Sequence, residues 1–143
     1  MKRILILTAI LVFACSSDDS SDTNDNSNQT FLERYDGVVW RGTIENEYDV
    51  RVQFINSPMS WIYYDDVINP PICNTYLFND ETQNPQMNLI NNSGGVLTIE
   101  EMSDYPIQYS FIVNEVDNTL TLEETEITSY TVFERTTLTD PCE

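Results

Sequence analysis

The chain has 143 residues, with 24 acidic and 6 basic side chains, no histidine and a formal net charge of −18. Such a negative field repels phosphate backbones and anionic lipid headgroups, which excludes nucleic acid as a partner. The absence of histidine excludes Ser-His-Asp and Cys-His catalytic sites and histidine-ligated metal centres.

The N-terminus has the pattern of an export signal. Lys2 and Arg3 precede an apolar run over residues 4–13, which only Thr8 interrupts. The ten residues of this run would span about 15 Å as a helix, half of a hydrocarbon core of roughly 30 Å, so the run is too short to cross a membrane. This pattern is typical of a cleavable signal peptide, here residues 1–14.

Residues 12–15, Val-Phe-Ala-Cys, resemble the lipobox of bacterial lipoproteins. The resemblance implies that Cys15 is acylated, for example with palmitate, and becomes the first residue of the mature chain. Several acyl chains on one cysteine would hold the protein on a membrane without a spanning helix. The alternative is an ordinary secretory signal followed by an incidental cysteine.

Residues 15–29 are expected to form a disordered acidic tether. The segment 16–28 reads SSDDSSDTNDNSN and has no apolar residue, so it cannot bury enough surface to offset the entropy of ordering. An acidic, serine-rich run directly after the cysteine resembles the export tag of Bacteroidota surface lipoproteins. The resemblance implies an outer-membrane location at the cell surface. A solubilising spacer on a lipoprotein that faces the periplasm is the alternative.

Residues 30–143 have the pattern of one all-β domain. Thr30 and Glu33 have the spacing of a capping box, which predicts one helical turn as far as Asp36. Beyond it, apolar and polar side chains alternate with a period of two. The expected strands are 38–45, 48–55, 61–64, 73–78, 87–90, 96–102, 105–113, 119–123 and 127–136. Such short strands separated by turns indicate a small antiparallel β-barrel of about eight strands, with a β-sandwich as the alternative.

Several short motifs carry a family resemblance: Leu32, Gly37 and Trp40 at the first strand, NTLTLEE at 118–124 and SYTVFERTT at 129–137. On these motifs the domain resembles the lipocalin-like, calycin-type domains of Bacteroidota lipoproteins. The resemblance implies that Trp40 lies across one end of the barrel and that Arg135 of the last strand packs over it.

The cysteines predict one disulfide. With Cys15 acylated, Cys73 and Cys142 remain as an even pair in an oxidising compartment. The alternative is two free buried thiols. An immunoglobulin-like sandwich is disfavoured because Trp40 and Trp61 both precede Cys73, whereas that fold places a tryptophan between its paired cysteines.

Seven aromatic residues are candidates for ligand contact, because alternation places them in the barrel interior or at its mouth. An eight-stranded barrel is just wide enough to be filled by side chains or to hold one small ligand, so the alternative is that they fill the core. The candidates are Tyr48, Phe54, Trp61, Tyr63, Tyr76, Tyr109 and Phe111.

No catalytic residue, metal site or cofactor is expected. Adjacent carboxylates such as Glu100-Glu101 and Glu123-Glu124 point to opposite faces of a strand, so adjacency does not make them catalytic pairs. The sequence therefore predicts a non-enzymatic, membrane-anchored lipoprotein that binds a small apolar or amphipathic molecule. The alternative is an accessory protein with a filled barrel that docks on an outer-membrane or secreted protein.

Overall fold

The computed structural model describes residues 28–45, 47–125 and 127–143. The expected signal peptide, Cys15 and the expected tether as far as residue 27 lie outside these ranges. In the described part, no helix is long and apolar enough to cross a membrane. Its elements are α1 (Phe31–Arg34), β1 (Val39–Ile44), β2 (Tyr48–Asn56), β3 (Met59–Asp65), β4 (Ile72–Leu77), β5 (Gln86–Ser93), β6 (Val96–Met102), β7 (Ile107–Asn114), β8 (Thr119–Glu124) and β9 (Ile127–Arg135).

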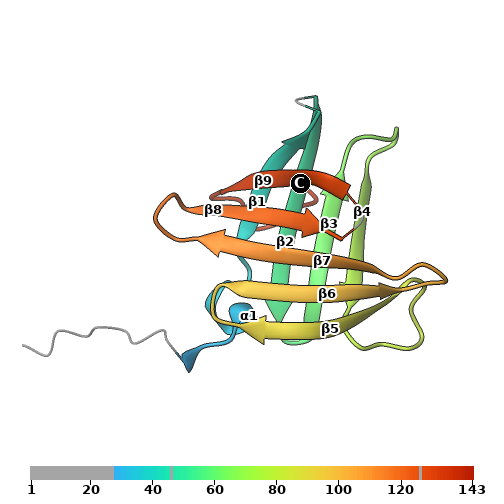
Figure 1. Ribbon diagram of the computed structural model, residues 1–143. Helices are drawn as coiled ribbons and strands as arrows, with labels where there is room; N and C mark the ends of the chain where they lie inside the picture. The colour runs from blue at the N-terminus through green and yellow to red at the C-terminus, as the bar shows by residue number, and fades with distance from the viewer. Residues whose placement is uncertain (1–27, 46, 126) are drawn as a thin grey trace, which may run out of the picture.

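The strands form one nine-stranded antiparallel sheet in the order β4-β3-β2-β1-β9-β8-β7-β6-β5 (Figure 1). Strands β1 to β4 pair with their neighbours in the chain, and so do strands β5 to β9; the two sets are joined where β1 pairs with β9. The two outermost strands, β4 and β5, come together through a single bridge between Phe78 and Met87. The sheet is therefore a nearly closed barrel with one seam between β4 and β5.

The structure confirms the all-β class and the antiparallel barrel, with nine strands where about eight were expected. The strand expected from residue 105 begins at Ile107. The strand expected to end at residue 90 continues to Ser93, through a bulge between Leu89 and Asn91. The strand accommodates its polar residues because a bulge changes the direction in which side chains point. In addition, Asn92 Oδ1 accepts a hydrogen bond from the Leu32 backbone N–H at 3.0 Å.

Helix α1 closes one end of the barrel. The predicted capping box is confirmed: Thr30 Oγ1 accepts the Glu33 backbone N–H at 3.3 Å, and Glu33 Oε2 accepts the Thr30 N–H at 2.8 Å. This short turn places Phe31 and Leu32, both fully buried, in the barrel end. The Tyr35 hydroxyl donates to Glu115 Oε1 at 2.8 Å. Burial together with this hydrogen bond raises the pKa of Tyr35 to about 12.

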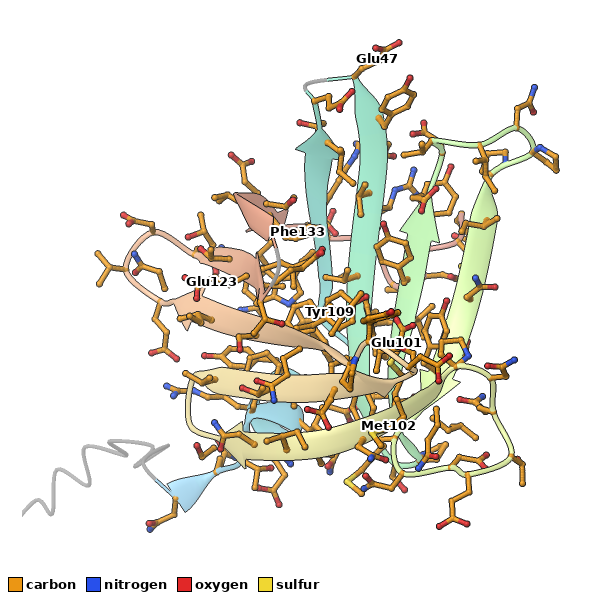
Figure 2. The ribbon with its side chains drawn as sticks, turned by 45° about the vertical axis from the view of Figure 1, so that its right-hand side comes forward. Glu47, Glu101, Met102, Tyr109, Glu123 and Phe133 are labelled. Atoms are coloured by element: carbon orange, nitrogen blue, oxygen red, sulfur yellow. A yellow bond between two sulfur atoms is a disulfide. The ribbon has the colours of Figure 1, made fainter. Side chains whose placement is uncertain are left out.

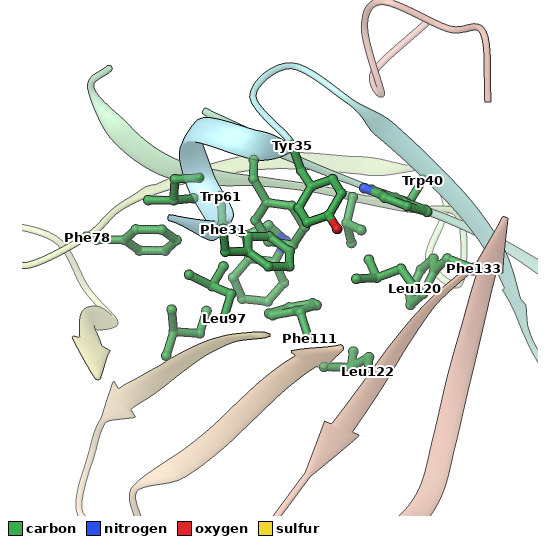
Figure 3. Packing of buried hydrophobic residues seen from close by; sticks show 14 of the residues in the cluster. Phe31, Tyr35, Trp40, Trp61, Phe78, Leu97, Phe111, Leu120, Leu122 and Phe133 are labelled. Carbon is green, nitrogen blue, oxygen red and sulfur yellow. The ribbon is translucent and has the colours of Figure 1, made fainter. Parts of the chain in front are cut away.

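Aromatic rings fill the barrel beneath α1 (Figure 3). Phe31 packs on Phe54 with ring centroids 5.2 Å apart, Phe54 packs on Phe111 at 4.9 Å, and Phe111 packs on Trp61 at 5.3 Å. Burying one large apolar side chain contributes roughly 1.5–3 kcal/mol, and an edge-to-face pair adds about 0.5–1.5 kcal/mol. These contacts make the α1 end of the barrel a filled core.

The β1–β9 pairing closes the barrel, and Gly42 makes it possible. Gly42 lies opposite Phe133 in the register, on the inner face. A Cβ atom at Gly42 would lie 2.8 Å from the Val132 carbonyl oxygen and 3.0 Å from the Phe133 ring. The absent side chain therefore lets the Phe133 ring lie over β1 and the two strands approach closely.

Trp40 and Arg135 are direct partners across the same β1–β9 junction. Trp40 is fully buried, with its ring 6.0 Å from the Tyr35 ring, whereas Arg135 is exposed. The stacking of Arg135 on Trp40 that the family resemblance implies is not among the cation–π contacts of the described residues, which are Arg34 on Tyr35 and Arg51 on Tyr64.

Residues 136–143, the C-terminal strap, cross the outer wall of the barrel. The Thr136 backbone N–H donates to the Val39 carbonyl in β1 at 3.0 Å. The Gln53 side-chain amide, on the outer face of β2, donates to the Thr139 carbonyl at 3.1 Å. Because the strap covers it, Gln53 is buried although it points away from the core.

A disulfide between Cys73 in β4 and Cys142 holds the end of the strap, with Cα atoms 5.8 Å apart. The Arg51 guanidinium also donates to the Pro141 carbonyl at 3.0 Å. The bonded cysteines are 69 residues apart in the chain, and a cross-link of that length contributes about 4 kcal/mol in the chain-entropy model. The strap therefore ties β1, β2 and β4 together from outside.

The close approach at Gly42 predicts that Gly42→Ala destabilises the barrel by about 1–3 kcal/mol, because the new methyl group overlaps a backbone oxygen. Urea denaturation followed by tryptophan fluorescence measures this change. Gly95→Ala is the matched control: its Cβ would meet the Val113 carbonyl at 3.5 Å, an ordinary contact. We expect a change of less than about 1 kcal/mol there. Equal losses in both variants would contradict the prediction.

Candidate functional site

A cavity of about 200 Å³ lies inside the barrel, at the end away from α1. Every strand contributes to its lining, including the last residues of β1 and β8. The lining residues are Ile44, Val50, Trp61, Tyr63, Tyr76, Met87, Glu101, Tyr109, Leu122, Glu124, Thr131 and Phe133. The same barrel is therefore filled at one end and hollow at the other.

Trp61 is the centre of an aromatic wall. Alternation puts Trp61 and Tyr63 on the inner face of β3, and the register sets Tyr76 of β4 opposite Trp61. The Trp61 ring lies 5.5 Å from the Tyr63 ring, 5.5 Å from the Tyr76 ring and 5.6 Å from the Tyr109 ring. Trp61 is 5% exposed, whereas the three tyrosines are half-buried. The wall thus combines flat apolar faces with hydroxyl groups, which suits an amphipathic ligand.

Two carboxylates, Glu101 and Glu124, belong to the same lining. The Tyr109 hydroxyl donates to Glu101 Oε2 at 3.2 Å, and these residues lie side by side where β6 ends and β7 begins (Figure 2). Glu124 lies directly opposite Tyr109 in the β7–β8 ladder. Burial raises the pKa of Glu124 above its usual value. The two glutamates thus flank one tyrosine, and the charges of both help to raise the pKa of its hydroxyl.

The hydroxyls of Tyr63 and Tyr109 at the cavity remain protonated at neutral pH, because the pKa of each is raised. Burial raises the pKa of Tyr109, and the charge and hydrogen bond of Glu101 raise it further. Burial also raises the pKa of Tyr63, with the Asp65 carboxylate as the next cause. The charge of Glu124 acts in the same direction on both hydroxyls. Both groups are therefore available as hydrogen-bond donors.

No arginine or lysine is among the lining residues. Arg34 pairs with Glu115 at 2.5 Å, beside α1. Arg41 and Arg51 pair with Asp49 at 2.8 and 2.7 Å. Arg135, the fourth arginine of the described residues, lies at the β1–β9 junction near α1. The negative charge of the cavity is therefore not balanced by a basic side chain of its lining.

Trp61 also carries a buried polar atom without a partner. Within the described residues, the buried side-chain nitrogen or oxygen atoms that lack a hydrogen bond are Nε1 of Trp61 and Nε1 of Trp40. Only Trp61 is a lining residue of the cavity. No group of three or more cysteine, aspartate or glutamate side chains in the described part of the chain is arranged to hold a metal ion.

Four of the seven aromatic residues named from the sequence line the cavity, and three do not. Trp61, Tyr63, Tyr76 and Tyr109 form the wall. Phe54 and Phe111 are fully buried in the core toward α1, and Tyr48 pairs with Ile44 at the end of the β1–β2 hairpin. Alternation identifies the inner face of a strand, but it does not say how deep in the barrel a side chain lies.

The sequence analysis did not name the two cavity glutamates as ligand-contacting residues. A signal for them exists, because Glu101 continues the inward alternation of Leu97 and Ile99, and Glu124 continues that of Leu120 and Leu122. A carboxylate at the end of an inward-facing apolar row lies near a barrel mouth. The remaining missed lining residues are aliphatic, aromatic or small: Ile44, Val50, Met87, Leu122, Thr131 and Phe133.

Comparisons with known proteins give no relative for this chain: no family model, no curated protein and no solved structure matches it.

The raised pKa of Glu124 predicts that its charge lowers stability at neutral pH. A carboxyl group with a higher pKa in the folded state binds its proton more tightly when folded. Its cost is therefore absent below the unfolded value of 4.5 and grows as the pH rises through the folded pKa. We expect Glu124→Gln to raise the urea midpoint at pH 7 and to leave it nearly unchanged at pH 4.

The matched control for this prediction is Glu123→Gln, one residue earlier in β8, where the side chain is exposed. Exposed substitutions usually change stability by less than about 0.5 kcal/mol, so we expect similar midpoints for this variant and the parent at both pH values. A gain at pH 7 that is the same for both variants would show that net charge, and not burial of Glu124, is responsible.

Proposed function

We propose that this chain is an exported lipoprotein whose barrel binds one small amphipathic molecule in the cavity away from α1. The observation that carries the proposal is a hollow of about 200 Å³ lined by aromatic and aliphatic side chains with a few polar groups. Ligand sites typically have this composition, in which apolar walls supply affinity and a few polar groups fix orientation.

The size of the cavity limits the part of a ligand that it can enclose to roughly one or two rings. An apolar cavity of about 150 Å³ in a protein interior is large enough to bind benzene. The present cavity is somewhat larger and opens toward solvent, so part of a ligand can remain outside it. A long acyl chain does not fit within this volume.

The proposed location rests on the N-terminal sequence. A signal peptide over 1–14, a lipid on Cys15 and an acidic tether over 15–29 would place the barrel on the outer membrane, at the cell surface. With no fixed geometry imposed by a spanning helix, the tether would leave the cavity free to meet ligands in solution.

Binding is tested with the neutral fluorescent probe N-phenyl-1-naphthylamine. We expect saturable binding of one probe per domain, with increased and blue-shifted emission because the probe leaves water. Leu122→Trp, which fills the cavity, should abolish this signal, whereas Val132→Trp on the exposed face of β9 should retain it. No saturable binding by the folded parent would overturn the proposal and favour docking on a protein partner instead.

Membrane attachment is tested separately by fractionating cells that express the full chain. We expect the parent in the membrane fraction, with acyl chains on Cys15 detected by mass spectrometry of its N-terminal peptide. Each buried methylene contributes roughly 0.8 kcal/mol, so Cys15→Ser should move the protein to the soluble fraction. Ser16→Cys in the Cys15→Ser background tests whether the position matters: attachment restored by this variant would contradict a unique role for Cys15.

A further inference from the structure

We propose that the molecule held in the cavity is an organic cation: a protonated amine attached to a compact aromatic or branched apolar body. This inference rests on the proposed function, because it names the ligand class of the same cavity. It follows from the charge of the lining, the type of ring that surrounds it and the arrangement of two carboxylates around one tyrosine.

The charge of the lining selects a cation. Glu101 and Glu124 are its charged residues, and the ion pairs of the described residues include neither of them. Two carboxylates in one half-buried cavity carry negative charge that no basic group of the lining balances, and a positive group between them would balance it. A neutral ligand would leave that charge unbalanced, and an anion would add to it.

The aromatic wall favours the same ligand. The rings of Tyr63, Tyr76 and Tyr109 surround the Trp61 indole at 5.5–5.6 Å between centroids, so several ring faces and edges border one small space. Electron-rich rings attract cations, tryptophan and tyrosine most strongly, and the attraction grows where water is excluded. Aromatic cages for amines use this combination of rings with an acidic side chain.

The geometry gives the ammonium group a defined place. Tyr109 donates to Glu101 at 3.2 Å and pairs with Glu124 across the β7–β8 ladder, so its hydroxyl contacts one carboxylate and lies within the electrostatic range of the other. An ammonium group has three donors, enough for both carboxylates and a tyrosine oxygen. Leu122 and Phe133 line the rest of the cavity and would contact the apolar body, and the unpartnered Trp61 Nε1 could meet an acceptor atom on it.

A metal ion suits the site less well than an amine. Calcium and magnesium require six or more oxygen ligands, including water. Here the lining offers two carboxylates among mostly apolar residues, and the described residues contain no acidic group of three. An apolar wall offers no ligand atoms to a metal ion, whereas it can pack against the apolar body of an amine.

The experiment compares three naphthalene ligands of similar shape that differ in charge: 1-naphthylmethylamine, 1-naphthalenemethanol and the 1-naphthaleneacetate anion. Isothermal titration calorimetry at pH 7 measures binding of each to the folded domain. A charged hydrogen bond and a cation–π contact together correspond to at least about a tenfold gain in affinity. We therefore expect the amine to bind at least about tenfold more tightly than the alcohol and the acetate to show no binding.

Two pairs of variants assign the effect to the cavity glutamates. Glu101→Gln and Glu124→Gln should each reduce the preference for amine over alcohol, while alcohol binding stays near the parent value. Glu100→Gln and Glu123→Gln are the matched controls, since they precede the cavity residues in the same strands and point outward. Both controls remove the same net charge but should keep the full preference for the amine.

Each outcome distinguishes this inference from the proposed function. Equal binding of amine and alcohol, or tighter binding of the acetate, would overturn the inference that the ligand is a cation. The proposal that the barrel binds a small molecule would remain. If all four variants reduce the preference for the amine equally, net charge alone explains the preference. That result would overturn the assignment of the cation site to Glu101 and Glu124. No binding of any of the three, together with no binding of N-phenyl-1-naphthylamine, would overturn both proposals.

Discussion

The pairing of the first strand with the last is the constraint on which the rest of this molecule depends. Without it, the nine strands would form two separate sheets, β1–β4 and β5–β9, whose inner faces are exposed to water. Gly42 permits this pairing because it leaves room for the Phe133 ring and the Val132 carbonyl, and the buried Trp40 lies beside it in β1. Closure gives the sheet an inside, and both the core and the cavity are consequences of having one.

The two ends of this interior differ because different residues reach them. At one end, a four-residue helix places Phe31 and Leu32 inside the barrel, and stacked aromatic rings fill the space. At the other end, the described part of the chain places no helix, and half-buried tyrosines and glutamates border the cavity. A filled end fixes the strands against one another, which keeps the lining of the hollow end in place without a ligand. Such preorganisation reduces the entropy lost on binding.

Much of the fold follows from the sequence, while the site follows only in part. The period of two identified the inner face of each strand, the Thr30–Glu33 spacing identified α1, and the even pair Cys73 and Cys142 identified the cross-link. The position of a side chain along the barrel axis depends on the strand register, the strand tilt and the place of α1. The sequence of a single strand determines none of these. The sequence therefore predicts Phe54 and Tyr63 equally as ligand-contacting residues, although of these two only Tyr63 lines the cavity. The doublets Glu100-Glu101 and Glu123-Glu124 predict no catalytic pair from adjacency, and adjacency alone does not show that Glu101 and Glu124 are the members that line the cavity.

The seam between β4 and β5 gives the cavity one wall that differs from the others. Tyr76 of β4 and Met87 of β5 both line the hollow, yet the two strands share one bridge instead of a continuous ladder. Elsewhere, enlarging the hollow means separating strands that exchange backbone hydrogen bonds along their length. Across the seam, the long thioether side chain of Met87 can change rotamer and yield space at little cost. Under the proposed function, the seam is therefore the part of the wall that a bulky ligand would displace at the lowest cost.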